Sequence, residues 1–201
     1  MEGQRIAVLG GTFNPIHNGH LYLATAFLQR LCLNQVLLIP TGIPPHKEAA
    51  DLATGEQRLR MCLLAAAGNP ALGVRDLELR REGKSYTVDT LRQLRQEFPG
   101  AALYLITGAD MFLTLDRWVA FREILSLATV CAAPRDAVSA TELRRFARVL
   151  EQAGGNALVL DEFPPAISST MVRQMVKAGK SIEGLVPKAV EEYIRSNNLY
   201  R

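Results

Sequence analysis

The sequence predicts a doubly wound α/β domain with a mainly parallel sheet. Short, largely apolar runs alternate along the chain with longer segments of helical periodicity. Most of the apolar runs end at a glycine or a proline, as expected of strands that are buried on both faces and then enter a loop. The length of 201 residues suits one domain with a full hydrophobic core, so we expect residues 1–201 to form a single domain.

Six apolar segments are predicted to be strands. They cover residues 5–9, 35–39, 72–77, 101–106, 127–132 and 157–160. Helices are predicted between and after them, over residues 20–31, 55–67, 87–98, 141–153, 169–178 and 187–197. This alternation is typical of a Rossmann-like sheet, which binds ligands beyond the carboxyl ends of its strands. We expect the C-terminal helices, about 169–197, to pack on this sheet domain.

Particular residues suggest how these helices begin and which side they bury. Asn18 is a suitable N-cap for the first helix, and Pro187 suits the first turn of the last one. Leu59, Leu63 and Leu64 lie on one side of the helix over 55–67, so we expect that side to face the core.

Composition excludes several classes of protein. The chain is 48% hydrophobic and 21% charged, which indicates a globular fold, and its net charge of +3 includes no basic arm for nucleic acid. No apolar run is long enough for a membrane span, and the N-terminus lacks the pattern of a signal peptide. Cys32, Cys62 and Cys131 are scattered in apolar surroundings, so we expect buried free thiols in a reducing cytoplasm.

The most informative segment follows the first strand and runs from Gly10 to His20. Its two leading glycines let a ligand approach the main chain closely. His17 and His20 then stand at the start of a helix, where free N–H groups and a partial positive charge attract phosphate. The chain has three histidines in all, so two in one loop favour a phosphate site over a turn with surface histidines.

Two familiar phosphate motifs are absent. The glycines after the first strand do not form G-x-G-x-x-G. Gly83-Lys84-Ser85 is similar to the end of a P-loop, but Glu78 stands where the earlier glycine of that motif is required.

Longer segments resemble a known family. Gly11-Thr12-Phe13-Asn14-Pro15 with His17-Asn18-Gly19-His20 resembles the signature of the small nucleotidyltransferases, and Ile167–Arg173 is similar to their second signature. Further segments resemble those of bacterial nicotinate-nucleotide adenylyltransferases in family order: 39–47, 85–90, 107–110, 116–118 and 199–201. The chain departs from the family at Asn14, where aspartate is common, at Lys84, where proline is common, and at Thr41-Gly42.

The resemblance implies transfer of AMP from ATP to nicotinate mononucleotide, giving nicotinate adenine dinucleotide and pyrophosphate. It implies that His20 stabilises the α-phosphoryl group, that His17 holds the phosphates beside it, and that Arg173 grips the outer phosphates. The implied ATP contacts are Gly10, Gly11, Thr12, Phe13, His17, His20, Gly108, Asp110, Ile167, Ser168, Ser169, Thr170 and Arg173. The implied acceptor contacts are Thr41, His46, Lys47, Ser85, Tyr86, Thr87 and Trp118. Mg²⁺ is expected to accompany ATP, with no metal site of the protein's own.

Other readings remain open at the level of sequence. The acceptor can instead be nicotinamide mononucleotide or phosphopantetheine. His17, His20 and His46 can be the three ligands of a zinc hydrolase, although that reading leaves Ile167–Arg173 without a role. A nucleotide sensor without catalysis is a third class, and the oligomeric state is not fixed by the sequence. Release of pyrophosphate from ATP and an acceptor separates adenylyl transfer from the other two classes.

Overall fold

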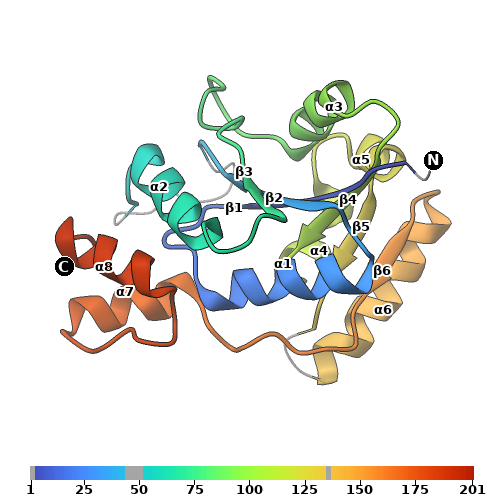
Figure 1. Cartoon of the computed structure of the whole chain (residues 1–201). Coiled ribbons are helices and arrows are strands. Elements are labelled where there is room, and N and C mark those ends of the chain that lie inside the picture. Colours follow the sequence, from blue (N-terminus) through green and yellow to red (C-terminus); the bar gives the residue numbers. More distant parts are fainter. Residues whose placement is uncertain (1–2, 44–51, 135–136) are drawn as a thin grey trace.

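The computed structural model describes residues 3–43, 52–134 and 137–201, and its centre is a twisted sheet (Figure 1). Within these residues six strands lie in the order β3-β2-β1-β4-β5-β6, and every neighbouring pair is parallel. Their bounds are Arg5–Gly11 (β1), Gln35–Pro40 (β2), Leu72–Val74 (β3), Ala102–Thr107 (β4), Thr129–Ala132 (β5) and Ala157–Val159 (β6). This is the strand order of doubly wound dinucleotide-binding folds, so the predicted fold class is confirmed.

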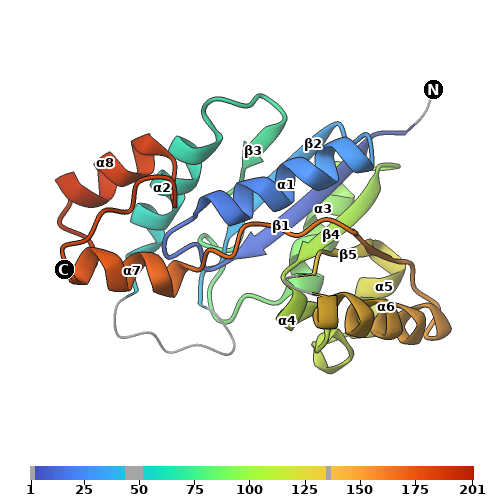
Figure 2. The same ribbon diagram turned by 90° about the horizontal axis from the view of Figure 1, so that it is seen from below.

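Helices cover both sides of the sheet, with α1 below the strands and α3 and α5 above them in Figure 1. The bounds are Asn18–Arg30 (α1), Gly55–Ala66 (α2), Thr87–Glu97 (α3), Ala109–Phe112 (α4), Phe121–Leu127 (α5), Ala137–Gln152 (α6), Ser169–Lys177 (α7) and Lys188–Ser196 (α8), with a 3₁₀ turn, η1, at Leu115–Arg117. In both views α7 and α8 lie together beside α2, at the opposite end of the molecule from α6 (Figure 2).

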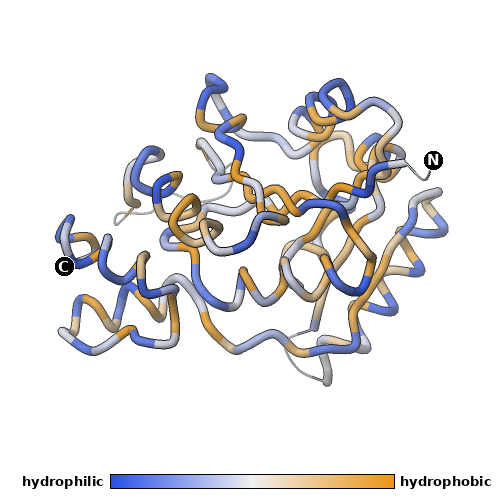
Figure 3. The backbone as a smooth tube through the Cα atoms, in the orientation of Figure 1, coloured by the Kyte–Doolittle hydropathy of each residue, from blue (hydrophilic) through white to orange (hydrophobic). Residues whose placement is uncertain are grey.

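The alternation of β1 divides the interior into two apolar clusters. Ala7 and Leu9 belong to the cluster that includes Phe27 of α1, and Ile6 and Val8 belong to the cluster that includes Leu91 of α3. Figure 3 shows hydrophobic strands in the middle of the molecule and hydrophilic stretches on the outer helices. Burial of both faces explains why the strand sequences are nearly free of charge.

The C-terminal helices share the first of these clusters. Val172 of α7 and Val190 of α8 are both fully buried, together with Met61 and Cys62 of α2. A single domain over residues 1–201 stays a prediction, which this shared core supports.

All six predicted strands and all six predicted helices are present, with shifted ends. Between β4 and β5 the structure has three further short elements, α4, η1 and α5, that were not predicted. Leu127, predicted to begin a strand, is instead the last residue of α5, and β5 begins at Thr129. Elements of three to seven residues span two turns at most, which is too short for the apolar periodicity of a helix to appear.

The predicted helix starts are also corrected. Asn18 is the first residue of α1, and His17 is its N-cap. Asn18 instead binds the segment before α8: its main-chain N–H donates to Leu185 O at 2.8 Å, and its side-chain amide donates to Gly184 O at 2.8 Å. Pro187 is the N-cap of α8 rather than a residue of its first turn. Of the three cysteines, Cys62 and Cys131 are buried as predicted, but Cys32 is exposed after the end of α1, and all three are free.

Candidate active site

The loop between β1 and α1 begins at the carboxyl edge of the sheet, with an open face on one side. Gly10 and Gly11 are the last residues of β1 rather than part of the loop, and Gly11 O accepts a hydrogen bond from Thr41 N at 2.9 Å. No atom lies within 4 Å of the place where a Cβ on Gly10 would stand, whereas a Cβ on Gly11 would lie 3.0 Å from the Phe13 ring. A ligand can therefore approach the main chain at Gly10.

His17 and His20 form a stacked pair at the start of α1. The centroids of the two rings lie 3.6 Å apart with an interplanar angle of 24°, and His17 N–H donates to His20 Nδ1 at 3.2 Å. Because Nδ1 of His20 accepts, the neutral ring carries its proton on Nε2. His20 therefore has an N–H donor for a phosphoryl oxygen without being charged.

The neighbours of this pair fix its geometry. The buried Phe13 ring packs edge-on against His20, with centroids 5.0 Å apart. A Cβ on Gly19 would lie 3.1 Å from His17 Nδ1 and 3.3 Å from Pro165 O, so a side chain here would fit only if these neighbours moved slightly. Phe13 is 2% exposed, so its side chain belongs to the core rather than to an open ligand surface.

The second signature lies against the same loop. Arg173 Nη1 donates to Asn14 O at 2.8 Å, and Ser169 Oγ donates to Pro15 O at 2.8 Å. Ser168 is the N-cap of α7 and accepts from Met171 N at 3.1 Å. The structure thus brings the two predicted halves of the ATP site together, although more than 150 residues separate them in the chain.

A cavity of about 150 Å³ lies beside this contact. It is lined by Thr170, Arg173, Gln174, Lys177, Tyr200 and Arg201. Three of these side chains are cationic and none is a carboxylate. Residues 169–201 contain six basic and three acidic residues, an excess that equals the net charge of +3 of the whole chain. This end of the molecule therefore attracts phosphate more strongly than the rest.

The segment after β2 meets a buried acid. Glu78 is 6% exposed, and its carboxyl accepts from Thr90 Oγ1 at 2.8 Å. The hydroxyls of Ser85 and Thr41 lie near enough to this carboxyl to lower its pKa. Ser85 Oγ also accepts from Gly42 N at 3.1 Å. Burial raises the pKa of Glu78, while the three hydroxyls and the charge of Arg81 oppose that rise.

Arg58 of α2 is buried below the same segment and is 2% exposed. Its Nη1 donates to Thr12 O at 2.8 Å and to Thr41 O at 2.6 Å, and its Nε donates to Ala53 O at 3.1 Å. Burial lowers the pKa of Arg58, yet an arginine in a protein stays protonated. The prediction for α2 is therefore confirmed only in part, because Leu64 packs against the first apolar cluster and Leu59 is half-buried, while the fully buried line of the helix is a different one. The helix turns the line of Arg58, Met61 and Cys62 inward, and Leu63 is 43% exposed.

The other predicted residues fall in several places. Tyr86 is the N-cap of α3 and Thr87 its first residue, and no side chain caps this helix. Gly108 is the N-cap of α4 and Asp110 lies exposed in its first turn, directly after β4. Trp118 is half-buried at the end of η1. Ile167 packs against the first apolar cluster. His46 and Lys47 lie outside the described residues.

In the described part of the chain, no three histidine, cysteine, aspartate or glutamate side chains are grouped so that they could hold a metal ion. The zinc reading needs His46, which lies outside that part. No helix within the same ranges is long and apolar enough to span a membrane.

Sequence reasoning did not assign four residues that connect the site. They are Asn14, Arg58, Glu78 and Tyr200. The Tyr200 hydroxyl donates to Asn14 Oδ1 at 2.8 Å, and Ala53 N donates to the same oxygen at 3.1 Å. A signal existed for Arg58, because it is one helical turn before Met61 and Cys62 and therefore shares their face. No local signal points to Tyr200.

A doubly wound sheet, with two segments at its carboxyl edge that resemble phosphate-binding signatures, is typical of nucleotide-binding transferases. Residues 8–175 match the family model described as cytidylyltransferase-like, so the chain belongs to the cytidylyltransferase-like family.

Curated relatives in the same family match nearly the full chain. The probable nicotinate-nucleotide adenylyltransferase of Synechococcus sp. (strain JA-3-3Ab) is 44% identical over 99% of this chain and 96% of the relative. The protein of the same name from Moorella thermoacetica is 43% identical over 98% of this chain and 92% of the relative. A third, from Dictyoglomus thermophilum, is 41% identical over 98% of this chain and 99% of the relative.

Solved structures agree on the fold. The Plasmodium falciparum nicotinic acid mononucleotide adenylyltransferase complexed with NaAD has a TM-score of 0.79 and 16% identity, over 98% of this chain and 97% of that chain. A putative nicotinate-nucleotide adenylyltransferase from Vibrio parahaemolyticus has a TM-score of 0.70 and 19% identity, over 98% of this chain and 96% of that chain. At these identities the likeness concerns the fold alone.

Proposed function

We propose that this protein transfers AMP from ATP to nicotinate mononucleotide, giving nicotinate adenine dinucleotide and pyrophosphate, a step of NAD biosynthesis. The observation that carries the proposal is the full-length match to relatives named nicotinate-nucleotide adenylyltransferase, 37–44% identical. The site supports it, because both phosphate-binding segments meet at one edge of the sheet.

The reaction forms a bond between a phosphate oxygen of the acceptor and the α-phosphorus of ATP, and it breaks the bond from that phosphorus to the β-phosphate. A mononucleotide phosphate is already largely ionised at neutral pH, so the attack needs no general base. The protein has to align the two phosphates and to offset the charge on the oxygens around the α-phosphorus.

The residues at the β1–α1 loop suit that task. The Nε2–H of His20 can donate to an α-phosphoryl oxygen, and its ring is held by His17 and Phe13 before any substrate binds. Gly10–Thr12 would bring main chain to the nucleotide. Ser168–Thr170 and Arg173 would hold the β- and γ-phosphates at the start of α7. Gly108 and Asp110, after β4, are proposed to contact the adenosine.

Mg²⁺ is proposed to arrive with ATP. Mg²⁺ in nucleotide-dependent enzymes is commonly bound by substrate phosphates and water together with one or two carboxylates. When bound, it would neutralise part of the charge of the leaving pyrophosphate.

The acceptor is proposed to lie between the segment after β2 and the start of α3. Thr41 and Ser85 line this region, and the uncapped main-chain N–H groups at Thr87 can bind the carboxylate of the pyridine ring. Trp118 offers a flat face for the ring itself. Both substrates are small molecules, and we propose that the protein works in the cytoplasm, where ATP is available.

An acceptor panel tests the proposal. The purified protein is mixed with ATP and Mg²⁺ and with nicotinate mononucleotide, nicotinamide mononucleotide or phosphopantetheine, and pyrophosphate release is measured. We expect release with nicotinate mononucleotide. No release with any of the three would refute adenylyl transfer, and release with phosphopantetheine alone would overturn the acceptor.

A further inference from the structure

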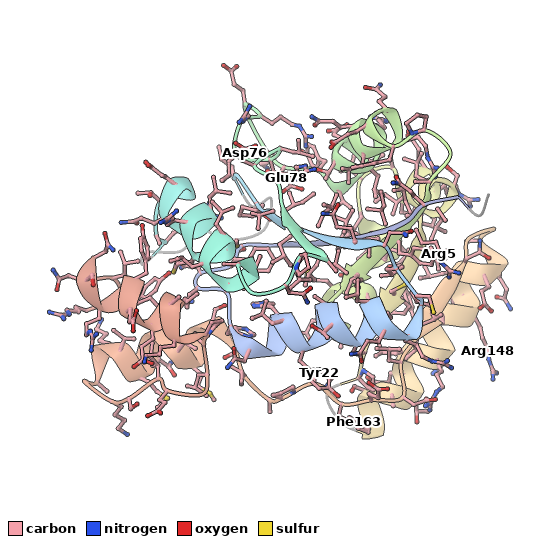
Figure 4. All side chains as sticks on the ribbon, viewed as in Figure 1. Arg5, Tyr22, Asp76, Glu78, Arg148 and Phe163 are labelled. Carbon is pink, nitrogen blue, oxygen red and sulfur yellow. The ribbon has the colours of Figure 1, made fainter. Side chains whose placement is uncertain are left out.

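The main chain of Thr41 and Gly42 lies between two buried ionisable side chains that come from different segments. From one side Arg58 donates to Thr41 O at 2.6 Å and to Gly42 O at 3.4 Å. From the other side the Glu78 carboxyl lies near the hydroxyls of Thr41 and Ser85, and Ser85 Oγ accepts from Gly42 N at 3.1 Å. Figure 4 shows Glu78 on the connection that follows β3, above the strands.

This segment also touches the Glu78 main chain. A Cβ on Gly42 would lie 2.3 Å from Glu78 O and 3.1 Å from Ser85 Oγ, so no side chain fits there without moving the backbone. The close approach accounts for Gly42 at a place where the family often uses another residue. The segment therefore has one position, fixed on three sides.

Such an arrangement is costly for stability alone. The hydrogen-bond partners of Arg58 among the described residues are carbonyl oxygens, and those of Glu78 are hydroxyls. No ion pair joins Arg58 to Glu78, so each charge is desolvated without a direct counter-charge from the other. Apolar side chains of similar volume would usually serve the core as well. The cost is explained if the position of Thr41 and Gly42 matters for binding.

We propose that Glu78 and Arg58 are positioning residues that hold the Thr41–Gly42 segment in place for the acceptor. This inference rests on the proposed function, in which that segment lines the acceptor site. Glu78 acts on the acceptor side, because the hydroxyls near its carboxyl belong to Thr41, Ser85 and Thr90, and its charged neighbour Arg81 lies on its own segment. Arg58 acts on both the acceptor segment and the β1–α1 loop, because its Nη1 donates to Thr41 O and also to Thr12 O at 2.8 Å.

Steady-state kinetics with ATP and nicotinate mononucleotide varied separately test the inference. Glu78→Gln leaves a single oxygen for three hydroxyls. We expect it to raise KM for the acceptor about tenfold and to change KM for ATP by less than about twofold. Arg58→Met should raise both KM values and lower kcat. Glu82→Gln and Arg60→Met, exposed neighbours of the same charge, are the matched controls and should behave as the wild type.

Hydrogen–deuterium exchange gives a second readout that needs no turnover. Glu78→Gln should speed exchange of the Gly42 amide, because that amide donates to Ser85 Oγ, which lies near the altered side chain. If Arg58→Met does not fold, Arg58→Lys takes its place. An unchanged acceptor KM in a folded Glu78→Gln variant overturns the inference. For Glu78→Gln, equal rises of the KM for ATP and the KM for the acceptor, together with a lower Tm, would also overturn the inference, because they indicate a purely structural role. If the wild-type protein releases no pyrophosphate, the proposed function is refuted, and the acceptor role of the Thr41–Gly42 segment is refuted with it. Hydrogen–deuterium exchange at Gly42 still shows whether Glu78 and Arg58 hold this segment in place.

Discussion

The imidazole of His17 lies flat against that of His20, with 3.6 Å between the ring centroids, while its own main-chain N–H bonds to Nδ1 of the second ring. One residue thus sets both the orientation and the tautomer of the other. The donor on His20 Nε2 is in place before substrate arrives, which is the condition under which a hydrogen bond lowers a barrier most effectively.

Replacing His20 should therefore affect the chemical step more than nucleotide binding. We expect His20→Ala to lower kcat by roughly 10²–10³, because one preorganised donor is lost, while KM for ATP changes little. Pyrophosphate release at saturating substrates measures the effect, and the Tm of the variant serves as the control for folding. A folded variant with near-normal turnover would remove His20 from the role proposed for it.

Arg173 should distinguish nucleotides by their outer phosphates. We expect Arg173→Ala to weaken binding of ATP more than binding of AMP, because AMP has no β- or γ-phosphate. Some loss should be common to both nucleotides, since Arg173 also holds Asn14 O in the loop. Calorimetry with each nucleotide gives the two values, and Arg195→Ala on the exposed surface of α8 is the matched control. Losses of equal size would place Arg173 away from the outer phosphates.

The acceptor should be chosen by the charge of its ring. Main-chain N–H groups at an uncapped helix start favour a carboxylate, and an amide would bring its own N–H donors toward them. We expect kcat/KM for nicotinate mononucleotide to exceed that for nicotinamide mononucleotide by at least roughly tenfold, about 1.4 kcal/mol. Competition between the two in one assay measures the ratio. Comparable efficiencies would refute this specificity and leave adenylyl transfer untouched.

Thiol reactivity should separate the cysteines. Burial raises the pKa of Cys62 and of Cys131 to about 12, so at pH 8 both are neutral thiols and poor nucleophiles. Cys32 is exposed. We expect one cysteine to react quickly with a thiol reagent at pH 8 in the native protein and all three to react in denaturant. Rapid reaction of two or more in the folded state would contradict the burial of Cys62 and Cys131.

Much of the fold could be predicted because its signals are local. The strand at β1 is an uninterrupted apolar run closed by two glycines, and α3 keeps Val88, Leu91 and Leu94 on one face, as its buried side confirms. The β1–α1 loop was also accessible, since glycines and histidines beside a strand carry a physical meaning of their own. In each case the residues that indicate the structure are close neighbours in the sequence.

What escaped prediction depends on contacts between distant segments. The inward side of α2 is decided by carbonyl oxygens at Thr12 and Thr41 that Arg58 can reach, and hydrophobicity alone favours the opposite choice of Leu63. The bond from Tyr200 to Asn14 spans 186 residues. Neither segment contains a local pattern that predicts this contact. The bonds from Tyr200 and Ala53 to Asn14 Oδ1 are therefore visible only in the folded structure.

The two bonds that reach Asn14 from the C-terminal helices have a consequence for local opening of the fold. Arg173 of α7 and Tyr200, after α8, both hold Asn14 in the β1–α1 loop. If these helices detach locally, the loop loses both bonds while the strands keep their own pairing. The shape of the loop therefore depends on the local stability of α7 and α8, and it is lost before the sheet unfolds.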